Sequence, residues 1–568
     1  MATSKERLSR IFALVVLLSL AISACAAPPA QVIEKEVTRI AKETVIVAST
    51  PQVTTTPVPP KSPPRTTLIY GVEATFANLD PHVTPSTVAT RITQHVTDPL
   101  VWQPELGHFE PGLATEWSVN ADSTEYTFKL RQDVKFHDGT PFNAEAVKFS
   151  FDRIVDPAMK SQVGVILMGP YSETQIINDY EVKVKFKSSF APFLDSVSNP
   201  YLNPVSPTAL KRVGNENWGV TELVGTGPFK LESFVLDNQV VLVRNPDYQW
   251  GPKFLGMSGP SKIEKIIFKT ILEPATRVAS LDTGETDFIA AVPPLDFGRL
   301  KADPKFVTIQ MARPGVGETL IMNFENPPLD ELAVRRAIQL AINKNAMIQT
   351  IWDGIGTPAC GPLTRTTFGF DPSACDMYPY DLKSAQKLLD EAGWKVGADG
   401  IRERGGKRLV IGHYSVATDV VTLQKAAFMK ASLAQVGIEV EIHALSRSGY
   451  TAAVLAGKHH TQGWWDTGTD PDGLLRALYY SPNVEVGTNR SHYRNKEMDQ
   501  LIDAAAATSD PAKRAALYSQ IQKKCNDEAI SVYYVDISNL YAHTKNLKGV
   551  FNNLGGNFPY FYAAEFSQ

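Results

Sequence analysis

One strand–helix–strand segment in the second half of the chain restricts the fold more than any other feature. Residues 408–414 are strand-like, and residues 418–436 have the pattern of a helix that a threonine can cap and that Gly437 ends. Residues 438–443 then alternate between apolar and polar side chains, as in a half-buried strand. This spacing is typical of a βαβ unit with parallel strands and a right-handed crossover. The sequence therefore predicts an α/β protein.

The chain is too long for a single hydrophobic core. With 568 residues, we expect two or three lobes. Hydrophobic residues make up 43% of the chain and charged residues 20%, which are ordinary values for a soluble globular protein. The formal net charge is -4 and the lysines and arginines are dispersed, so a nucleic-acid partner is disfavoured.

The first residues have the features of an export signal. Basic residues precede the apolar run 11–22, which is too short to span a bilayer comfortably. Small residues precede Cys25 in an arrangement that resembles the lipobox of bacterial lipoproteins, a family in which this cysteine becomes the acylated N-terminus. The alternative is an ordinary secretory signal with an incidental cysteine. We predict a lipoprotein signal peptide over residues 1–25.

The segment that follows, residues 26–65, is expected to be a tether. It is rich in Pro and Thr and has no apolar period, so it favours an extended, solvated chain. A tether of this kind holds a folded domain beside a membrane. That arrangement favours capture or scaffolding over cytoplasmic metabolism.

Two cysteines bracket one loop of the later half. Cys360 and Cys375 flank a stretch rich in Gly, Pro and Thr, and an exported protein allows them to pair. Closing a loop of about 15 residues stabilises a fold by about 3 kcal/mol. Cys525 lies in a helical pattern and is expected to be a buried thiol.

Shorter patterns predict further elements. Residues 67–72 are strand-like, residues 125–131 alternate as in a half-buried strand, and Asn143 can cap a helix. In the motif 225–229, two glycines permit close backbone approach and positive φ, and the phenylalanine starts a strand. Helices are expected over 496–507 and 510–529, and a closing strand over 530–535.

Several motifs occur together in the order and spacing of a known family. They resemble the family 5 solute-binding proteins of ATP-driven importers, a group that contains oligopeptide-, dipeptide- and nickel-binding proteins. The resemblance covers residues 66–568. The motifs lie at residues 78–82, 112–117, 128–147, 225–229, 275–287, 323–338 and 380–394.

The resemblance implies a fold and a division into lobes. The fold is an α/β, periplasmic-binding-protein-like type II (cluster C) structure, with two hinged lobes and an extra inserted lobe. Two crossing strands would join lobes I and III, which would close on a ligand like a clamp. The implied boundaries are 66–86, 223–307 and 530–568 for lobe I, 87–222 for the inserted lobe II, and 308–529 for lobe III.

The stretch 464–472 is the main candidate for a ligand site. It combines two indoles, three carboxylates and a glycine, and it is expected between two helices. Indoles supply flat apolar walls, and a carboxylate can hold a ligand ammonium group. The alternative is that the Asp-Pro-Asp run caps the following helix while the tryptophans pack in the core. The candidate ligand-binding residues here are Trp464, Trp465, Asp466, Thr467 and Asp470.

The resemblance refines one of these roles. In peptide-binding relatives an aspartate in this stretch holds the N-terminal amine of the peptide. That position is usually three residues before the Asp-Pro pair, where this chain has Thr467, and Asp466 lies one position earlier. We therefore expect Asp466 to hold the amine only if the shift by one residue is accommodated.

Four other residues are candidates from their type and position. His82 follows the first strand, where α/β lobes present ligand loops. Arg313 or Arg365 can meet a ligand carboxylate with its guanidinium fork, and Asn323 resembles a family position close to the cleft. Each of them also has the ordinary alternative of a surface or structural residue.

Enzyme, cofactor and metal functions have little support. The sequence has no Gly-x-Ser-x-Gly, His-Glu-x-x-His, Gly-x-x-x-x-Gly-Lys-Ser/Thr or Cys-x-x-Cys motif. The adjacent pair His459 and His460 is expected at an exposed helix end and not on a metal. The remote alternative is a secreted hydrolase that uses Asp466 and Asp470 as a carboxylate pair.

These observations lead to one expected function. The chain is expected to be a monomeric, lipid-anchored receptor outside the cytoplasmic membrane, periplasmic or at the cell surface. It would capture a di- or oligopeptide and deliver it to the permease of an ABC importer by lobe closure. The alternatives for the solute are an oligosaccharide, an opine, and nickel or another metal chelate.

Overall fold

The computed structural model describes residues 65–375 and 377–567. The predicted signal peptide, Cys25 and the tether up to residue 64 lie outside these residues. Within them, none of the helices combines the length and the apolar character that crossing a membrane requires.

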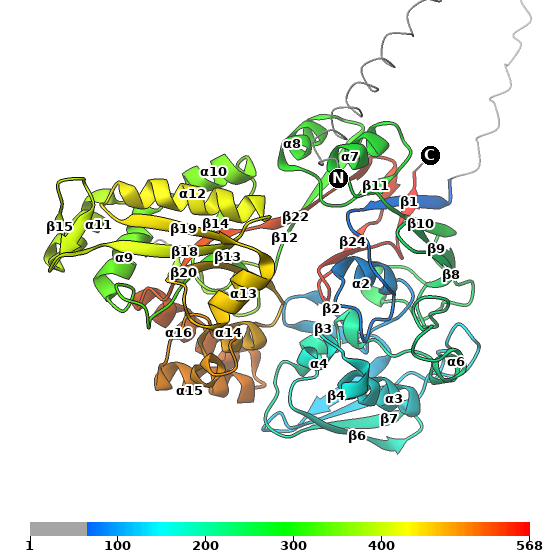
Figure 1. The fold of residues 1–568 in the computed structure, drawn as a ribbon. Coiled ribbons are helices and arrows are strands. Elements are labelled where there is room, and N and C mark those ends of the chain that lie inside the picture. Colours follow the sequence, from blue (N-terminus) through cyan, green and yellow to red (C-terminus); the bar gives the residue numbers. More distant parts are fainter. Residues whose placement is uncertain (1–64, 376, 568) are drawn as a thin grey trace, which may run out of the picture. The chain divides into compact units, whose positions relative to one another are not determined.

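Three sheets organise the described chain (Figure 1). The first is seven-stranded; its strand β1 runs parallel to both of its neighbours, and the outer pairs are antiparallel. In spatial order its strands are β12 (Phe306–Ala312), β22 (Ser538–Thr544), β11 (Phe288–Ile289), β1 (Thr67–Val72), β10 (Lys265–Thr270), β9 (Gln239–Arg244) and β8 (Phe229–Val235).

The second sheet is six-stranded and contains the predicted βαβ unit. Strands β18 and β19 are parallel, and the helix between them, α12 (Val420–Ala434), packs on both. This confirms the expected unit, although the helix cap is Asp419 and not Thr418, because the Asp419 carboxylate accepts from the amide of Thr422. The strand order is β14 (Thr357–Pro358), β21 (Ser531–Asp536), β13 (Gly315–Met322), β20 (Thr461–Thr467), β18 (Val410–Val416) and β19 (Glu439–Leu445).

The third sheet is four-stranded and antiparallel. The predicted alternation is confirmed in its strand β5, where Tyr126, Phe128 and Leu130 are buried. Asn143 caps α3 (Ala144–Val155) by accepting from the amide of Ala146, as predicted. The strand order is β4 (Ala114–Val119), β5 (Glu125–Leu130), β7 (Glu181–Phe186) and β6 (Tyr171–Asn178).

The remaining elements are short sheets and surrounding helices. The predicted helices over 496–507 and 510–529 are observed as α15 and α16, with the second capped by Asp510. The small strands are β2 (Val101–Glu105), β3 (His108–Pro111), β15 (Lys395–Val396), β16 (Arg402–Arg404), β17 (Lys407–Arg408), β23 (Leu547–Lys548), β24 (Phe551–Asn553), β25 (Phe558–Tyr560) and β26 (Glu565–Phe566). The other helices are α2 (Thr87–Thr93), α4 (Gly164–Leu167), α5 (Phe193–Ser196), α6 (Pro207–Val213), α7 (Pro274–Asp282), α8 (Pro294–Ala302), α9 (Leu332–Ala341), α10 (Lys344–Trp352), α11 (Leu382–Glu391), α13 (Arg447–Leu455), α14 (Pro471–Tyr479), α15 (Lys496–Ala507) and α16 (Pro511–Asp527).

The chain crosses between the seven-stranded and six-stranded sheets at two adjacent places. The first crossing joins β12 to β13 through Arg313 and Pro314, and the second joins β21 to β22 through Ile537. The amide of Arg313 donates to the carbonyl of Ile537 at 3.0 Å, which ties the two crossings together. The lobe boundaries drawn from the sequence stay a prediction.

The motif 225–229 is a close backbone contact. A Cβ atom at Gly225 would lie 2.2 Å from the carbonyl oxygen of Val96, and the amide of Gly227 donates to that same oxygen at 2.9 Å. Phe229 opens β8, as predicted. Neither glycine has a positive φ, so these positions require glycine because of the space that the neighbouring chain occupies and not because of a left-handed backbone.

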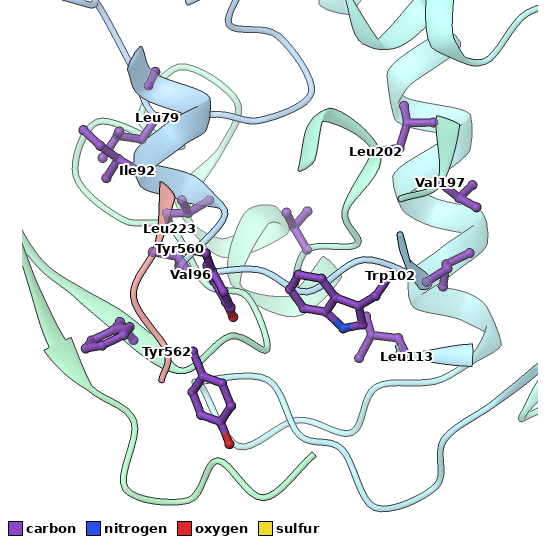
Figure 2. Packing of buried hydrophobic residues seen from close by; sticks show 14 of the residues in the cluster. Leu79, Ile92, Val96, Trp102, Leu113, Val197, Leu202, Leu223, Tyr560 and Tyr562 are labelled. Carbon is purple, nitrogen blue, oxygen red and sulfur yellow. The ribbon is translucent and has the colours of Figure 1, made fainter. Parts of the chain in front are cut away.

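Aromatic side chains near the C-terminus complete the core around the first helix. Tyr560 and Tyr562 are fully buried and belong to the same apolar cluster as Ile92 and Val96 of the α2 region (Figure 2). Trp102 packs beside Tyr560, with ring centroids 5.4 Å apart. Segments from the two ends of the described chain therefore share one core.

Candidate functional site

The stretch with the two tryptophans lies between the helices α13 and α14, as expected, and its first part is a strand that the sequence did not predict. It forms β20, which pairs antiparallel with β13 and parallel with β18. Successive side chains of a strand point to opposite faces. Accordingly, Trp464 is half-buried against the apolar cluster around α14 and α16, whereas Trp465 is 51% exposed. The indole of Trp464 therefore packs against the interior, whereas the indole of Trp465 is largely open to solvent.

A cavity of about 190 Å³ lies beside this strand. It forms where β18 ends and α12 begins, and α13 supplies another wall. The carboxyl ends of parallel strands are where α/β sheets bind ligands. The lining residues are Val416, Asp419, Thr422, Lys425, Arg447, Tyr450, Gly463, Trp464, Trp465 and Arg490.

The charged groups of this cavity are predominantly cationic. Lys425 forms an ion pair with Glu318 of β13, and both side chains are more than nine-tenths buried. Arg490 stacks on Trp464, with its guanidinium carbon 4.7 Å from the ring centroid. Arg447 adds a third cation, against the single carboxylate of Asp419 in the lining. The cavity therefore favours an anionic or acceptor-rich solute group.

Three buried N–H groups around the cavity have no hydrogen-bond partner among the described residues. They are Nε2 of Gln462, Nε1 of Trp464 and Nε of Arg490. The carbonyl oxygen of the same Gln462 side chain is already used, because the hydroxyl of Tyr450 donates to it. A buried donor without a partner costs about 1–3 kcal/mol. A cluster of such donors is what a site for hydrogen-bond acceptors requires.

Arg313, Trp465 and Asp466 form a group next to the first crossing. The guanidinium carbon of Arg313 lies 4.3 Å from the ring centroid of Trp465, a cation–π contact. Burial lowers the pKa of Arg313, and the charges of Glu318 and Asp466 oppose this shift. Burial likewise raises the pKa of Asp466, whose carboxylate accepts from the amide of Thr467 at 2.8 Å. Four predicted residues are thus brought together: Trp464, Trp465, Asp466 and Arg313.

Asp470 is a structural residue in this arrangement. It caps α14 by accepting from the amide of Asp472 at 2.9 Å, which is the alternative that the sequence left open. Both of its carboxylate oxygens also accept from the guanidinium of Arg514. Its side chain is 12% exposed. It is therefore not available as the second member of a hydrolytic pair with Asp466.

Two other predicted residues are engaged elsewhere. His82 is 1% exposed, its Nε2 lies 2.9 Å from the carbonyl oxygen of Asn203, and burial together with the charge of Arg153 lowers its pKa to about 4. Asn323 is fully buried and its amide donates to the carbonyl of Gly457 at 3.2 Å. The candidate site does not include these two residues, because their side chains are buried and form hydrogen bonds with other parts of the fold.

Arg365 and the histidine pair also differ from expectation. Arg365 forms an ion pair with Asp536 at 2.5 Å and lines a different cavity from the two tryptophans. The pair His459–His460 precedes β20 and is not at a helix end, so that expectation is wrong. His459 is fully buried, with Nε2 2.8 Å from the carbonyl oxygen of Arg490. It supports the backbone that carries a cavity arginine.

Sequence reasoning missed four of the cavity side chains: Lys425, Arg447, Tyr450 and Arg490. The first three have a usable signal, because they lie in the first two turns of helices that follow the parallel strands of the βαβ region. Arg490 lies in a loop and has no such local signal. Among the described residues, no group of three or more His, Cys, Asp or Glu side chains is placed to hold a metal ion.

Comparison with known proteins decides the family. The model of the bacterial extracellular solute-binding proteins, family 5, matches residues 108–485. The chain belongs to this family. Members bind small solutes and work with ABC permeases as transport components, and the expected type II α/β fold is confirmed.

Relatives within the family differ in what they bind. The glutathione-binding protein GsiB of Shigella flexneri is 30% identical over 495 residues, 85% of this chain and 91% of the relative. The nickel-binding periplasmic protein of Escherichia coli (strain K12) is 29% identical over 501 residues, 85% of this chain and 90% of the relative. The structure of the binding protein DppA from Helicobacter pylori in complex with the peptide STSA has a TM-score of 0.69 and 26% identity, and the match covers 89% of this chain and 99% of DppA.

Proposed function

We propose that this chain captures a short peptide or a peptide-like solute outside the cytoplasmic membrane and delivers it to an ABC permease. The cavity beside β20 holds the acceptor-bearing end of the solute. Closure of the two lobes about the strand crossings completes the site, and the closed form is what the permease recognises. Cys25 anchors the protein to the membrane through its lipid.

The cluster of three unpartnered donors carries this proposal. A peptide offers a C-terminal carboxylate and a row of carbonyl oxygens, which are the acceptors that Gln462, Trp464 and Arg490 lack. Arg447 and Arg490 add the positive charge that a carboxylate prefers. The relatives that bind glutathione and the peptide STSA are consistent with this class of solute.

Asp466 supplies the opposite end of the site. Its carboxylate lies on the same strand as the two tryptophans, near the Arg313 side chain. We assign it the ammonium group of the peptide, although it stands one position before the residue that relatives use. The apolar faces of Trp464 and Trp465 contact side chains or methylene groups between the two ends.

A chelated metal ion is the second candidate solute. The nickel-binding relative favours it, and the cationic lining suits a chelator that carries several carboxylates. A chelator would bring its own ligands to the metal. Opines and oligosaccharides have no specific support in the cavity.

Calorimetry with purified protein tests the proposal. The panel consists of Ser-Thr-Ser-Ala, glutathione, two dipeptides, a nickel–histidine complex and a neutral trisaccharide. We expect saturable binding of at least one peptide with 1:1 stoichiometry and no cleavage product by mass spectrometry. If only the nickel complex binds, the solute is a metal chelate and not a peptide. Cleavage of any compound would overturn the receptor function. Membrane fractionation with a Cys25→Ala variant tests the anchor, because the variant should leave the membrane fraction.

A further inference from the structure

The loop closed by Cys360 and Cys375 holds the first strand crossing. The hydroxyl of Thr364 donates to the carbonyl of Arg313 at 2.8 Å, and the amide of Thr364 donates to the carbonyl of Gly315 at 2.9 Å. The amide of Gly315 in turn donates to the hydroxyl of Thr367 at 2.6 Å. The backbone on both sides of Pro314 is therefore bonded to one loop.

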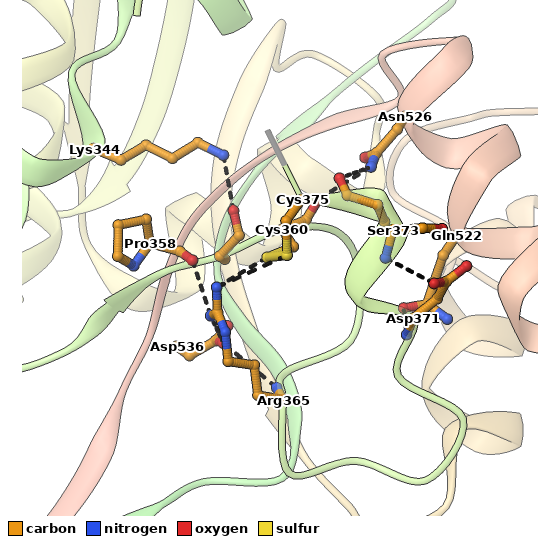
Figure 3. The surroundings of a disulfide bond; sticks show 12 residues. Lys344, Pro358, Cys360, Arg365, Asp371, Ser373, Cys375, Gln522, Asn526 and Asp536 are labelled. Atoms are coloured by element: carbon orange, nitrogen blue, oxygen red, sulfur yellow. Dashed lines mark hydrogen bonds and ion pairs between the residues drawn. A yellow bond between two sulfur atoms is a disulfide. The ribbon is translucent and has the colours of Figure 1, made fainter. Parts of the chain in front are cut away.

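The same loop also holds the second crossing. A guanidinium N–H of Arg365 donates to Oδ2 of Asp536 at 2.5 Å (Figure 3). Asp536 is the last residue of β21, directly before the crossing residue Ile537, and its side chain is 7% exposed. Arg365 also donates to Sγ of Cys360 at 2.9 Å, so the ion pair lies against the disulfide.

Helix α16 fixes the ends of the loop from the other side. The side-chain amide of Asn526 donates to the carbonyls of Cys360 and Ala374 at 3.0 Å each. The side chain of Gln522 donates to the carbonyl of Gly369 at 2.8 Å. The disulfide and this helix give the loop a fixed base from which it contacts the crossings.

The first crossing is in direct backbone contact with the cavity strand β20. Gly315 has a φ of 123°, and a Cβ atom there would lie 2.3 Å from the carbonyl oxygen of Asp466. The amide of Gly468 donates to the carbonyl of Pro314 at 3.2 Å. Since the backbones touch, a displacement at residues 313–315 displaces the end of β20.

We propose that the loop of residues 360–375 is a brace that fixes both crossings and so positions Arg313 against Trp465 in the solute cavity. Thr364, Arg365 and Thr367 are its positioning residues, and the disulfide keeps them in place. The consequence for solute affinity rests on the proposed function, whereas the positioning itself does not. The brace therefore has a test that needs no solute.

The test uses a Cys360→Ser, Cys375→Ser double variant labelled with 5-fluorotryptophan. A Trp465→Phe variant assigns the fluorine resonance of Trp465. We expect this resonance to shift or broaden in the double variant, and the resonance of the buried Trp218, which is 1% exposed, to stay unchanged. In hydrogen exchange, the amides of Arg313 and Gly315 should exchange at least tenfold faster than in the unmodified protein.

A second variant keeps the disulfide and removes only the hydroxyl contacts. The double variant Thr364→Val, Thr367→Val should reproduce the shift of the Trp465 resonance. If the cysteine variant does not fold, this threonine variant tests the brace in its place. Thr350→Val is the matched control, since that exposed hydroxyl donates to Ala346 within α10. A Trp465 resonance that is equal in the double threonine variant and in the control would overturn the brace. The Trp465 resonance tests the brace without any solute. If the unmodified protein does not bind peptide but the resonance shifts as expected, the proposed function fails and the brace stands.

Discussion

Two cavities beside the six-stranded sheet differ in how their polar groups are used. The larger one, of about 260 Å³, is lined by the Cys360–Cys375 disulfide and by residues of α10 and α16. Its polar groups bond to each other: Tyr378 donates to the carbonyl of Asn526 at 2.7 Å, and Lys344 donates to the carbonyl of Ala359 at 2.9 Å. The smaller cavity, of about 190 Å³, is surrounded by donors that have no partner in the described chain.

The difference shows that volume does not identify the site. A fold gains nothing by leaving buried donors unpaired, because each one costs about 1–3 kcal/mol. We propose that the donors around the smaller cavity are retained because a solute supplies the missing acceptors. Arg365 of the larger cavity, by contrast, belongs to a loop that contacts the strand crossings. The smaller cavity is therefore the place to look for solute binding.

The largest effect is expected on stability. Glu318→Gln leaves Lys425 as a buried charge without its counter-ion, and the free energy of unfolding should fall by about 3 kcal/mol. Asp536→Asn at the larger cavity should cost less, because its partner Arg365 is 36% exposed and keeps part of its hydration. Chemical denaturation of both variants compares the two ion pairs. Equal losses in the free energy of unfolding would mean that the two ion pairs contribute equally to stability, despite their different exposure.

Arg490→Ala should reduce peptide affinity about a hundredfold, or about 2.7 kcal/mol. The variant removes an unpartnered donor, a positive charge and the cation that stacks on Trp464. Tyr378→Phe in the larger cavity is the control and should change affinity less than twofold. Calorimetry with the tightest-binding peptide of the panel measures both. A stronger effect of the tyrosine variant would assign the solute to the larger cavity.

Asp466→Ala should lower peptide affinity at least tenfold, which is about 1.4 kcal/mol. The carboxylate is assigned to the ammonium group of the peptide, and an N-acetylated peptide should therefore bind the variant and the unmodified protein equally. Thr467→Ala is the control for the neighbouring position and should have little effect. Unchanged affinity of the aspartate variant in calorimetry would show that this residue does not hold the amine.

The smallest effect is a pH dependence at the end of the cavity strand. The hydroxyl of Thr469 donates to Asp195 at 2.6 Å, and burial together with the nearby charge of Asp470 raises the pKa of Asp195 to about 7 from 3.8. Because the folded-state pKa is raised, the stabilising contribution of the protonated group is complete below about pH 3.8 and is lost as the pH rises through 7. Between pH 7 and 8 the free energy of unfolding should fall by less than about 1 kcal/mol through this group.

An Asp195→Asn variant provides the comparison for this pH dependence. It cannot lose a proton, so its stability should change less between pH 7 and 8 than that of the unmodified protein. Thermal denaturation at the two pH values gives the difference. Identical pH profiles would assign the ionisation to another group.

The sequence predicted those elements whose signals are local. The βαβ unit, the helix after Asn143 and the helix α15 each have a period or a cap within one segment, and the structure confirms them. The strand β20 was missed because glycine, threonine and aspartate surround its tryptophans and dilute any strand pattern. Its two neighbours in the sheet, β13 and β18, make it a strand, and neither is close to it in the chain.

The family and the α/β class could be predicted from the chain alone, since ordered motifs and periodicity are properties of the sequence, and the region of the two tryptophans could be named as a candidate site. Only the tertiary structure decided which side chains meet there. The Lys425–Glu318 ion pair joins residues 107 positions apart, and Arg490 reaches Trp464 from a loop with no pattern of its own. Whether a polar group is satisfied or unpaired depends on such distant neighbours, because a hydrogen bond requires its partner in space and not in sequence.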